Sequence, residues 1–276
     1  MGLKNYLINR KKKKFKKRHK VGLCLSGGGA RGFSYIGVFK ALEELGFKFD
    51  AVAGTSAGSL FGAMFATGIR ANEMIEKTKN IKTKDFRSSK LGFLPSKMDR
   101  LHETLTKVFG KTKIEDLKIS YFAVAVDLKT GKEVHFTSGD LCTIITGSCA
   151  IPGVFMPVKY KNMTLIDGGV SNNVPADVLR DHGCDFVVTI DCNSTRGGGT
   201  ASSNIITQFI TSVGIMMANN SKKGLAESDL IIRPDMKRFS SLNVNSVNEM
   251  IQEGYNAVMA NKDALEALFR GEFKKN

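Results

Sequence analysis

Residues 21–32 read VGLCLSGGGARG, a short apolar run that ends in a turn rich in glycine. A run of this kind is typical of a buried strand. The apolar residues that follow, from Tyr35 to Leu45, recur at the three- and four-residue spacing of a helix, and Gly46 is a reasonable terminator. The stretch therefore predicts a strand, a glycine turn and a helix in that order.

A second unit of the same kind begins at residue 51, where AVAGTSAG precedes a helix expected over Ser56–Thr67. Alternating strands and helices imply a three-layer α/β/α domain with a mainly parallel central sheet, whose site gathers beyond the carboxyl ends of the strands. The remaining strands are expected at Tyr121–Val126, Lys132–Phe136 and Phe186–Ile190, and the remaining helices at Met98–Val108, Pro175–His182, Ile205–Met217 and Val247–Phe269.

The chain has 276 residues and a net charge of +15, and the charge is unevenly distributed. Residues 1–20 hold ten Lys or Arg and no acid, which leaves +5 for the rest. We therefore expect a basic, disordered arm over residues 1–20 and one catalytic domain over residues 21–276. No apolar run reaches the roughly 18 residues of a membrane-spanning helix, and no apolar stretch of about 7–15 residues follows a basic start, as an export signal requires.

The basic segment Lys11–Lys20 suggests a polyanionic partner. An anionic membrane surface fits, because each Lys or Arg near anionic lipid contributes about 1 kcal/mol. Nucleic acid is the competing partner, which we consider unlikely, and a simply solvated arm is the third reading. The five cysteines are scattered and odd in number, which favours reduced thiols and therefore a cytoplasmic location. If the basic segment binds lipid, we expect the protein to lie peripherally on the inner face of the membrane. The oligomeric state is not readable from the sequence.

The motif Gly54-Thr55-Ser56-Ala57-Gly58 lies between the second strand and its helix. A Gly-x-Ser-x-Gly motif in this setting is typical of a nucleophile elbow, in which small neighbours let a strained turn expose the serine hydroxyl. Ser56 is then the nucleophile, and Gly54 and Gly58 shape the turn. The alternative is a plain helix cap, in which the Ser56 or Thr55 hydroxyl accepts a backbone N–H of the helix.

The glycine turn Gly27-Gly28-Gly29-Ala30-Arg31-Gly32 opens a helix, so its backbone N–H groups favour an anion. That anion is the oxyanion of a tetrahedral intermediate or a phosphate. The glycines also fit the G-x-G-x-x-G pattern of dinucleotide sites. We rank that reading lower, because the acid that holds the ribose should follow the second strand, whereas Asp50 precedes it.

The aspartate of Asp167-Gly168-Gly169 is the candidate base. The chain order Ser56, Asp167, His182 also suits a triad, but His182 is expected at a helix end, where a histidine stabilises the helix dipole. An ordinary aspartate, with a pKa near 3.9, is a weak base at neutral pH. We therefore expect burial to raise its pKa. The alternative for Asp-Gly-Gly is a turn without a chemical role.

These three motifs, in this order, resemble the patatin-like phospholipase family. The resemblance spans roughly residues 21–194, is strongest with small bacterial members, and extends through Ile114–Leu117, Val126–Gly131, Ser148–Pro157 and Asp167–Pro175. It implies a serine lipid acyl hydrolase that cleaves phospholipids or lysophospholipids through an acyl-enzyme, without a metal or organic cofactor. Carried over by position, the roles are nucleophile for Ser56, general base for Asp167, oxyanion hole for Gly27, Gly28 and Gly29, loop support for Arg31 and Gly32, elbow for Gly54 and Gly58, and base loop for Gly168 and Gly169.

Two other functions remain open at this point. One is a non-catalytic membrane- or nucleic-acid-binding protein on the same fold. The other is an acyltransferase or a neutral-lipid esterase, which shares every motif. Lys84–Pro95, which carries Leu91, Phe93 and Leu94, is expected either as a mobile flap that admits acyl chains or as a buried loop.

Overall fold

The computed structural model describes residues 19–79, 98–193, 205–241 and 243–272. Nearly all of the basic arm, the Lys84–Pro95 segment and the expected loop Thr195–Ser203 therefore lie outside the described residues. The last two residues of the arm are described. His19 packs edge-on against the ring of Phe186, and the Lys20 N–H donates to Asp185 Oδ2 at 2.8 Å.

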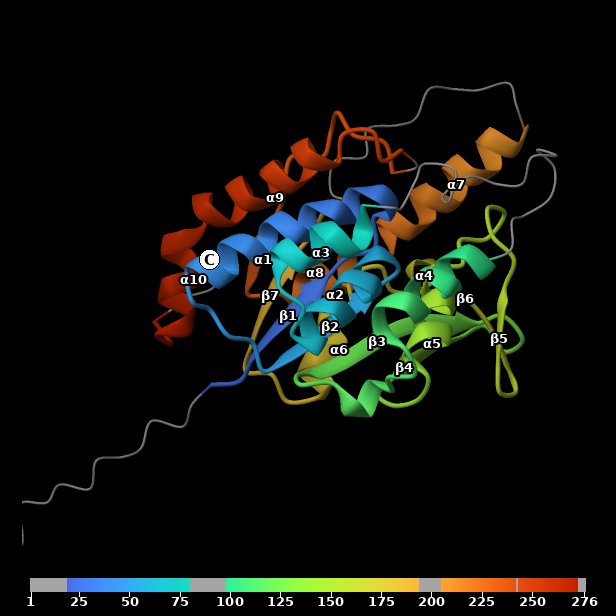
Figure 1. The fold of residues 1–276 in the computed structure, drawn as a ribbon, viewed down its shortest axis with the longest axis horizontal. Helices are drawn as coiled ribbons and strands as arrows, with labels where there is room; N and C mark the ends of the chain where they lie inside the picture. Colours follow the sequence, from blue (N-terminus) through green and yellow to red (C-terminus); the bar gives the residue numbers. More distant parts are fainter. Residues whose placement is uncertain (1–18, 80–97, 194–204, 242, 273–276) are drawn as a thin grey trace, which may run out of the picture.

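An eight-stranded sheet forms the centre of the molecule, with the order β5-β6-β3-β2-β1-β7-β8 and β4 paired to β3 (Figure 1). The strands are β1 Val21–Leu25, β2 Ala51–Thr55, β3 Ser120–Asp127, β4 Lys132–Phe136, β5 Val158–Tyr160, β6 Met163–Asp167, β7 Phe186–Ile190 and β8 Leu230–Ile232. The strands β5, β6 and β8 were not predicted. Strands β5 and β8 have only three residues each, and β6 mixes polar and apolar residues without a continuous apolar run.

The sheet is mixed, which refines the expectation of a mainly parallel one. The neighbours β3, β2, β1, β7 and β8 are all parallel, whereas β4 and β6 pair with β3 in the antiparallel sense and β5 does so with β6. The parallel part puts the ends of β1 and β2, and thus both glycine turns, at the same edge of the sheet.

Two strands follow one another along the same side of β3. Thr55, the last residue of β2, pairs with Val124, and Asp167, the last residue of β6, pairs with Ala125. Strand β4 pairs with residues 123–127 and so occupies the opposite side of β3. The end of β2, which leads into Ser56, and the end of β6, at Asp167, therefore meet, although the two residues are more than one hundred positions apart in the sequence.

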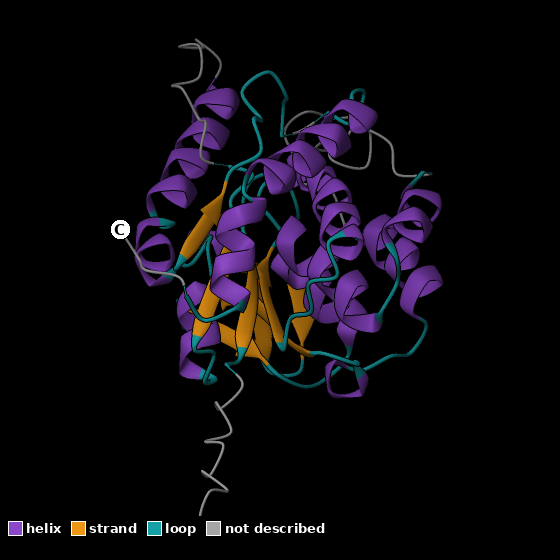
Figure 2. Cartoon of the chain, turned by 90° about the vertical axis from the view of Figure 1, so that its left-hand side faces the viewer, coloured by secondary structure: helices purple, strands orange, loops and turns teal. Residues whose placement is uncertain are grey.

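Helices cover both faces of the sheet (Figure 2). Side chains alternate along the strands, so Leu23 and Leu25 join the large core under α1, α2 and α9, whereas Cys24 joins the smaller core under α6. The helices are α1 Ser34–Glu44, α2 Ala57–Thr67, α3 Ala71–Thr78, α4 Asp99–Phe109, α5 Leu141–Ser148, α6 Ala176–Asp181, α7 Ile205–Asn219, α8 Lys222–Glu227, α9 Val247–Ala260 and α10 Lys262–Phe269.

Helix α9 lies alongside α1 at very short range (Figure 1). A Cβ atom on Gly37 would lie 1.8 Å from the Ile251 carbonyl oxygen, and one on Gly254 would lie 1.9 Å from that of Ser34. The two glycines therefore let the backbones touch, and this contact closes the domain over the first helix.

The single helix expected over Val247–Phe269 is wrong in one respect, because it breaks at Asn261 into α9 and α10. The Asn261 side-chain Nδ2 donates to the Ala257 carbonyl at 2.8 Å, and the Asn261 backbone leaves the helical region. Asparagine offers its backbone this local alternative to a helix, which explains why apolar periodicity missed the break.

Candidate active site

Ser56 occupies a strained turn between β2 and α2. Its backbone has φ +53° and ψ −123°, a conformation that non-glycine residues rarely adopt. A Cβ atom on Gly54 would lie 2.3 Å from the Gly58 carbonyl oxygen, and one on Gly58 would lie 2.2 Å from that of Leu25. Both glycines are therefore required for the tight turn that holds Ser56.

The Ser56 side chain does not cap α2. The Ser56 backbone N–H donates to Ser148 Oγ at 3.0 Å, and the Ser148 hydroxyl in turn donates to the Val124 carbonyl at 2.6 Å. The Thr55 hydroxyl donates to the Asn172 carbonyl at 2.8 Å, so it is also not a cap. The helix-cap alternative is therefore wrong for both residues, and the Ser56 hydroxyl is left without a structural bond to the helix.

The glycine turn lies beside Ser56, since a Cβ atom on Gly27 would be 3.4 Å from that of Ser56. The Gly27 N–H donates to the Asn173 carbonyl at 3.0 Å and is thus already used. Within the described part of the chain, the N–H groups of Gly28 and Gly29 have no acceptor. Gly29 has φ +58°, a left-handed conformation that suits glycine.

Arg31 and Gly32 hold this turn against the rest of the domain. The buried Arg31 guanidinium donates from Nε to the Phe239 carbonyl at 2.9 Å and from Nη1 to Asn193 Oδ1 at 3.2 Å. Burial lowers the pKa of Arg31, which still carries its charge at neutral pH. A Cβ atom on Gly32 would lie 2.7 Å from that of Ala57, so Gly32 makes room for the start of α2.

Asp167 is fully buried at the end of β6. Its Oδ1 accepts the Gly169 N–H at 2.8 Å, and among the described residues Oδ2 has no formed hydrogen bond. Burial raises the pKa of Asp167 to about 7, although the Gly169 N–H and the nearby Ser56 hydroxyl favour the charged form. A Cβ atom on Gly168 would lie 2.3 Å from the Val124 carbonyl, so this glycine lets the loop approach β3.

His182 is not part of this constellation. It follows α6, on the face of the sheet opposite α2, and its Nδ1 lies 2.8 Å from the Val178 carbonyl oxygen. Its ring packs against Phe122, with centroids 4.2 Å apart. The histidine thus has local partners at the end of its helix, in line with the reading from sequence.

Two clefts meet at Ser56. The first, of about 730 Å³, is lined mainly by apolar side chains from α2, α4 and the segment 149–155, with Phe33, Leu60, Phe61, Met98, Leu101 and Phe155 among them. The second, of about 520 Å³, is more polar and has Asn173, Asn193 and Ser241 in its wall, together with the glycine turn. Ser56, Gly29 and Ile151 border both clefts.

Sequence reasoning assigned no role to Cys149 and Asn173, which lie at the centre. The Cys149 thiol is close to Ser56, Ser59 and Asp167; burial raises its pKa, and the Asp167 charge raises it further, so it is a neutral thiol. Asn173 Oδ1 is buried without a hydrogen-bond partner in the described part of the chain. Both residues belong to motifs quoted for the resemblance, which is the only signal that pointed to them.

No helix in the described ranges is both long and apolar enough to cross a bilayer. Across the same ranges, no three His, Cys, Asp or Glu side chains gather as metal ligands. All five cysteines are described, and all are free thiols.

A family model described as patatin-like phospholipase matches residues 23–180. An uncharacterised NTE family protein of Mycobacterium tuberculosis is 32% identical over 199 residues, which cover 69% of this chain and 54% of that protein. Patatin-like phospholipase domain-containing protein 6 of Mus musculus is 34% identical over 188 residues, or 63% of this chain and 14% of that protein. The chain thus spans about half, or much less, of the length of these relatives.

Solved structures share the fold at low sequence identity. VipD of Legionella pneumophila aligns with a TM-score of 0.51 and 16% identity, covering 89% of this chain and 67% of that one. Human GIVD cytosolic phospholipase A2, solved in complex with methyl γ-linolenyl fluorophosphonate, aligns with a TM-score of 0.50 and 12% identity, covering 94% and 60%. The fold class and the family predicted from the three motifs are confirmed, and the chain belongs to the patatin-like phospholipase family.

Proposed function

We propose that this protein hydrolyses acyl esters of lipids, with Ser56 as nucleophile and Asp167 as general base. The observation that carries the proposal is a buried carboxylate, with a pKa raised to about 7, beside a serine on a strained turn. A general base is most effective when its pKa lies near the working pH. Membership of a phospholipase family supports a lipid ester as the substrate.

The proposed reaction has two stages. Asp167 takes the proton of the Ser56 hydroxyl while Oγ adds to the ester carbonyl, and the neutral Asp167 then gives that proton to the leaving alcohol. Water attacks the acyl-enzyme in the second stage, with Asp167 again as base, and the fatty acid leaves. No imidazole is needed, because burial already gives this carboxylate the basicity of a histidine.

The N–H groups of Gly28 and Gly29, which have no acceptor among the described residues, are the proposed oxyanion donors. The family resemblance assigns Gly27 to the same group, but the Gly27 N–H already donates to the Asn173 carbonyl, so we propose that Gly27 contributes by allowing close approach of the backbone. Donors fixed in advance stabilise the charge that develops in the transition state without reorganisation. Arg31 holds the turn that carries them in place.

The two clefts suggest how the substrate lies. The apolar cleft suits the acyl chain, and the polar cleft suits the glycerol and head-group side of the ester, with the carbonyl between them at Ser56. Phospholipids and lysophospholipids both have this division into an apolar and a polar half. An acyltransferase or a neutral-lipid esterase remains the alternative reaction of the same site.

Helix α7 supports substrate uptake at a lipid surface. Its 15 residues carry no charge, and Phe209, Ile215 and Met216 are each about half exposed, at 52%, 49% and 56%. The same helix lines the polar cleft through Val213 and Met217. We propose that α7, together with the basic segment Lys11–Lys20, brings the enzyme to an anionic membrane from a cytoplasmic, reducing compartment.

A fluorophosphonate probe carrying an acyl chain tests the nucleophile. We expect covalent labelling, with Ser56 as the modified residue in peptide mapping and no labelling of Ser56→Ala. Ser120→Ala is the matched control, because Ser120 is exposed at the start of β3 and should leave labelling unchanged. Wild-type protein that is folded yet unlabelled points instead to a non-catalytic lipid-binding protein.

Product analysis separates the reaction types. Purified protein is incubated with phosphatidylcholine, lysophosphatidylcholine and triacylglycerol, with and without glycerol as an acceptor. Free fatty acid from the first two substrates is the expected outcome. Transfer to glycerol, or turnover of triacylglycerol alone, favours the alternative reactions.

A further inference from the structure

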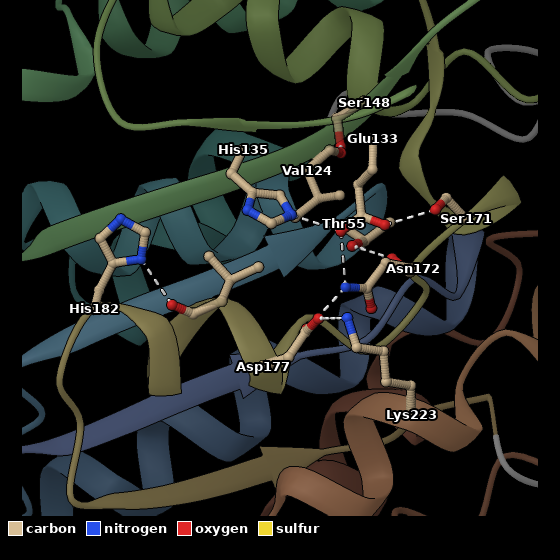
Figure 3. A network of polar contacts seen from close by, with 11 residues as sticks. Thr55, Val124, Glu133, His135, Ser148, Ser171, Asn172, Asp177, His182 and Lys223 are labelled. Carbon is tan, nitrogen blue, oxygen red and sulfur yellow. Dashed lines mark hydrogen bonds and ion pairs between the residues drawn. The ribbon is translucent and has the colours of Figure 1, made fainter. Parts of the chain in front are cut away.

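A half-buried carboxylate on the edge strand β4, that of Glu133, gathers polar side chains from its own strand and from the loop after β6 (Figure 3). Glu133 accepts hydrogen bonds from three of them, namely His135 Nε2 at 2.5 Å, Ser171 Oγ at 2.6 Å and Asn172 Nδ2 at 3.0 Å. Ser171 and Asn172 belong to the loop that begins at Asp167. Glu133 thus ties the edge of the sheet to the loop of the proposed base.

Asn172 is held from both sides. One hydrogen of its Nδ2 goes to Glu133 and the other to Asp177 Oδ1 at 2.8 Å, and Lys223 pairs with Asp177 at 2.5 Å. The Asn172 side chain is buried, so its amide is fixed by two carboxylates from two different elements. Asn172 therefore has a single orientation.

The backbone of Asn172 connects the two halves of the proposed site. Its carbonyl accepts the Thr55 hydroxyl at 2.8 Å, one residue before Ser56, and its N–H donates to the Gly168 carbonyl at 2.8 Å, one residue after Asp167. Any shift of Asn172 would therefore change the position of Asp167 relative to Ser56.

We propose that Glu133 is a positioning residue for catalysis: by holding Ser171 and Asn172, it fixes the separation of Ser56 and Asp167. This role rests on the proposed function. Glu133 does not act on the substrate, because the clefts that border Ser56 are lined by other residues. Reaction rates are sensitive to such placement, since a misplacement of about 1 Å can cost about 10²-fold in rate.

The electrostatics of the cluster keep Glu133 charged. Burial raises its pKa, but the hydrogen bonds from His135, Ser171 and Asn172 outweigh burial and bring the pKa to about 2. His135 in turn has a raised pKa, chiefly through its bond to Glu133. The other charged groups that face the pair are Asp177 and Asp181 of α6 and Lys223 of α8.

Glu133→Gln tests the proposal, because it keeps the size of the side chain and removes its charge. The number of active sites is first titrated with the fluorophosphonate, and kcat per titrated site is then measured from pH 5 to pH 9. We expect kcat to fall between tenfold and a hundredfold with KM unchanged. We also expect the acid limb of the pH profile to move to lower pH, because a loosened loop lets water reach Asp167.

The pH profile distinguishes positioning from plain stability. Asp229→Asn is the matched control, since Asp229 forms a partly buried ion pair with Arg180 at 2.6 Å and also holds the Val187 N–H, without contact to Asn172. It should lower Tm but leave kcat per site and the acid limb unchanged. Ser171→Ala is the milder second variant, which removes one exposed hydroxyl and should reduce kcat several-fold in the same manner.

The outcomes are separable. An unchanged kcat per titrated site and an unchanged acid limb in Glu133→Gln overturn the positioning role, while labelling of wild-type Ser56 leaves the proposed function intact. If Glu133→Gln does not fold, Ser171→Ala decides by the same two readouts. Failure of wild-type protein to react with the probe overturns the proposed function itself.

Discussion

The turn that carries Ser56 and the loop that carries Asp167 are held by different forces. Around Ser56, Gly54 and Gly58 let backbone segments approach so closely that no Cβ atom fits between them. Around Asp167, the position depends on hydrogen bonds that run through Asn172 to side chains of β4 and α6. Steric fit therefore dominates around the proposed nucleophile, whereas hydrogen bonding across the fold dominates around the proposed base, where Gly168 adds one close backbone contact.

Removal of either reacting group tests both regions at once and has the largest expected effect. Ser56→Ala and Asp167→Asn should each lower kcat/KM by about 10⁴-fold or more, because the two groups act as a unit. Fatty-acid release from lysophosphatidylcholine measures the loss. Wild-type rates in folded Asp167→Asn would show that the base lies elsewhere.

Gly28→Ala probes the steric side with a smaller effect. Its Cβ atom would lie 2.4 Å from Cys192 Sγ, which would displace the turn and its N–H groups. We expect kcat to fall about 10²-fold, as for the loss of one oxyanion donor. Cys192→Ala in the same protein opens space for the new methyl group and should restore part of the rate. A double variant no faster than Gly28→Ala would mean that the methyl group acts in another way.

The pH dependence of the rate probes the base. Because the pKa of Asp167 is about 7, about half of the carboxyl is ionised at pH 7 and about a tenth at pH 6, and in the proposed mechanism only the ionised form accepts the Ser56 proton. We expect kcat to rise through pH 7 and to be about tenfold below its plateau at pH 6. Initial rates with a soluble ester, measured between pH 5 and pH 9, give this profile. A plateau that extends unchanged down to pH 5 would contradict a raised pKa.

Stability should change in the opposite direction. A folded-state pKa above the ordinary value of 3.8 means that the folded protein binds the Asp167 proton more tightly than the unfolded chain does. The free energy of unfolding therefore falls as pH rises from about 4 to about 7, by at most about 4 kcal/mol. Asp167→Asn removes this cost, so we expect a higher Tm than wild type at pH 8 and a smaller difference at pH 4.

Thr55→Val has the smallest expected effect and tests the link between the two regions. The substitution removes only the Thr55 hydrogen bond to the Asn172 carbonyl. We expect a loss of about 1 kcal/mol in the free energy of unfolding and a few-fold lower kcat. Urea unfolding and steady-state rates measure the two quantities. A normal kcat with the expected loss of stability would confine this bond to a structural role.

The sequence predicted those features that depend on residues close together along the chain. Glycine motifs at strand ends predicted the turns of Ser56 and Asp167, and apolar periodicity predicted α1, α2 and α4 to within one residue at each end. The environment of Asp167 was less accessible, because Glu133 and Asn172 are 39 residues apart and become neighbours only through β6. The same holds for Arg31, whose partners Asn193 and Phe239 are far along the chain.

Strands β2 and β6 pair with the same side of β3, and this arrangement limits where the acyl-chain cleft can vary. The chain leaves β3 after Asp127 and returns in β6 only at Met163, and the excursion carries Cys149, Ile151 and Phe155 into the apolar cleft. The same excursion also supports the proposed reacting pair, because Ser148 Oγ accepts the Ser56 N–H at 3.0 Å and the Ala150 carbonyl accepts the Asp167 N–H at 3.0 Å. Cleft shape and backbone support thus come from one segment, so we expect changes in acyl-chain length to be confined to side chains such as those of Ile151 and Phe155, with the backbone at Ala150 kept in place.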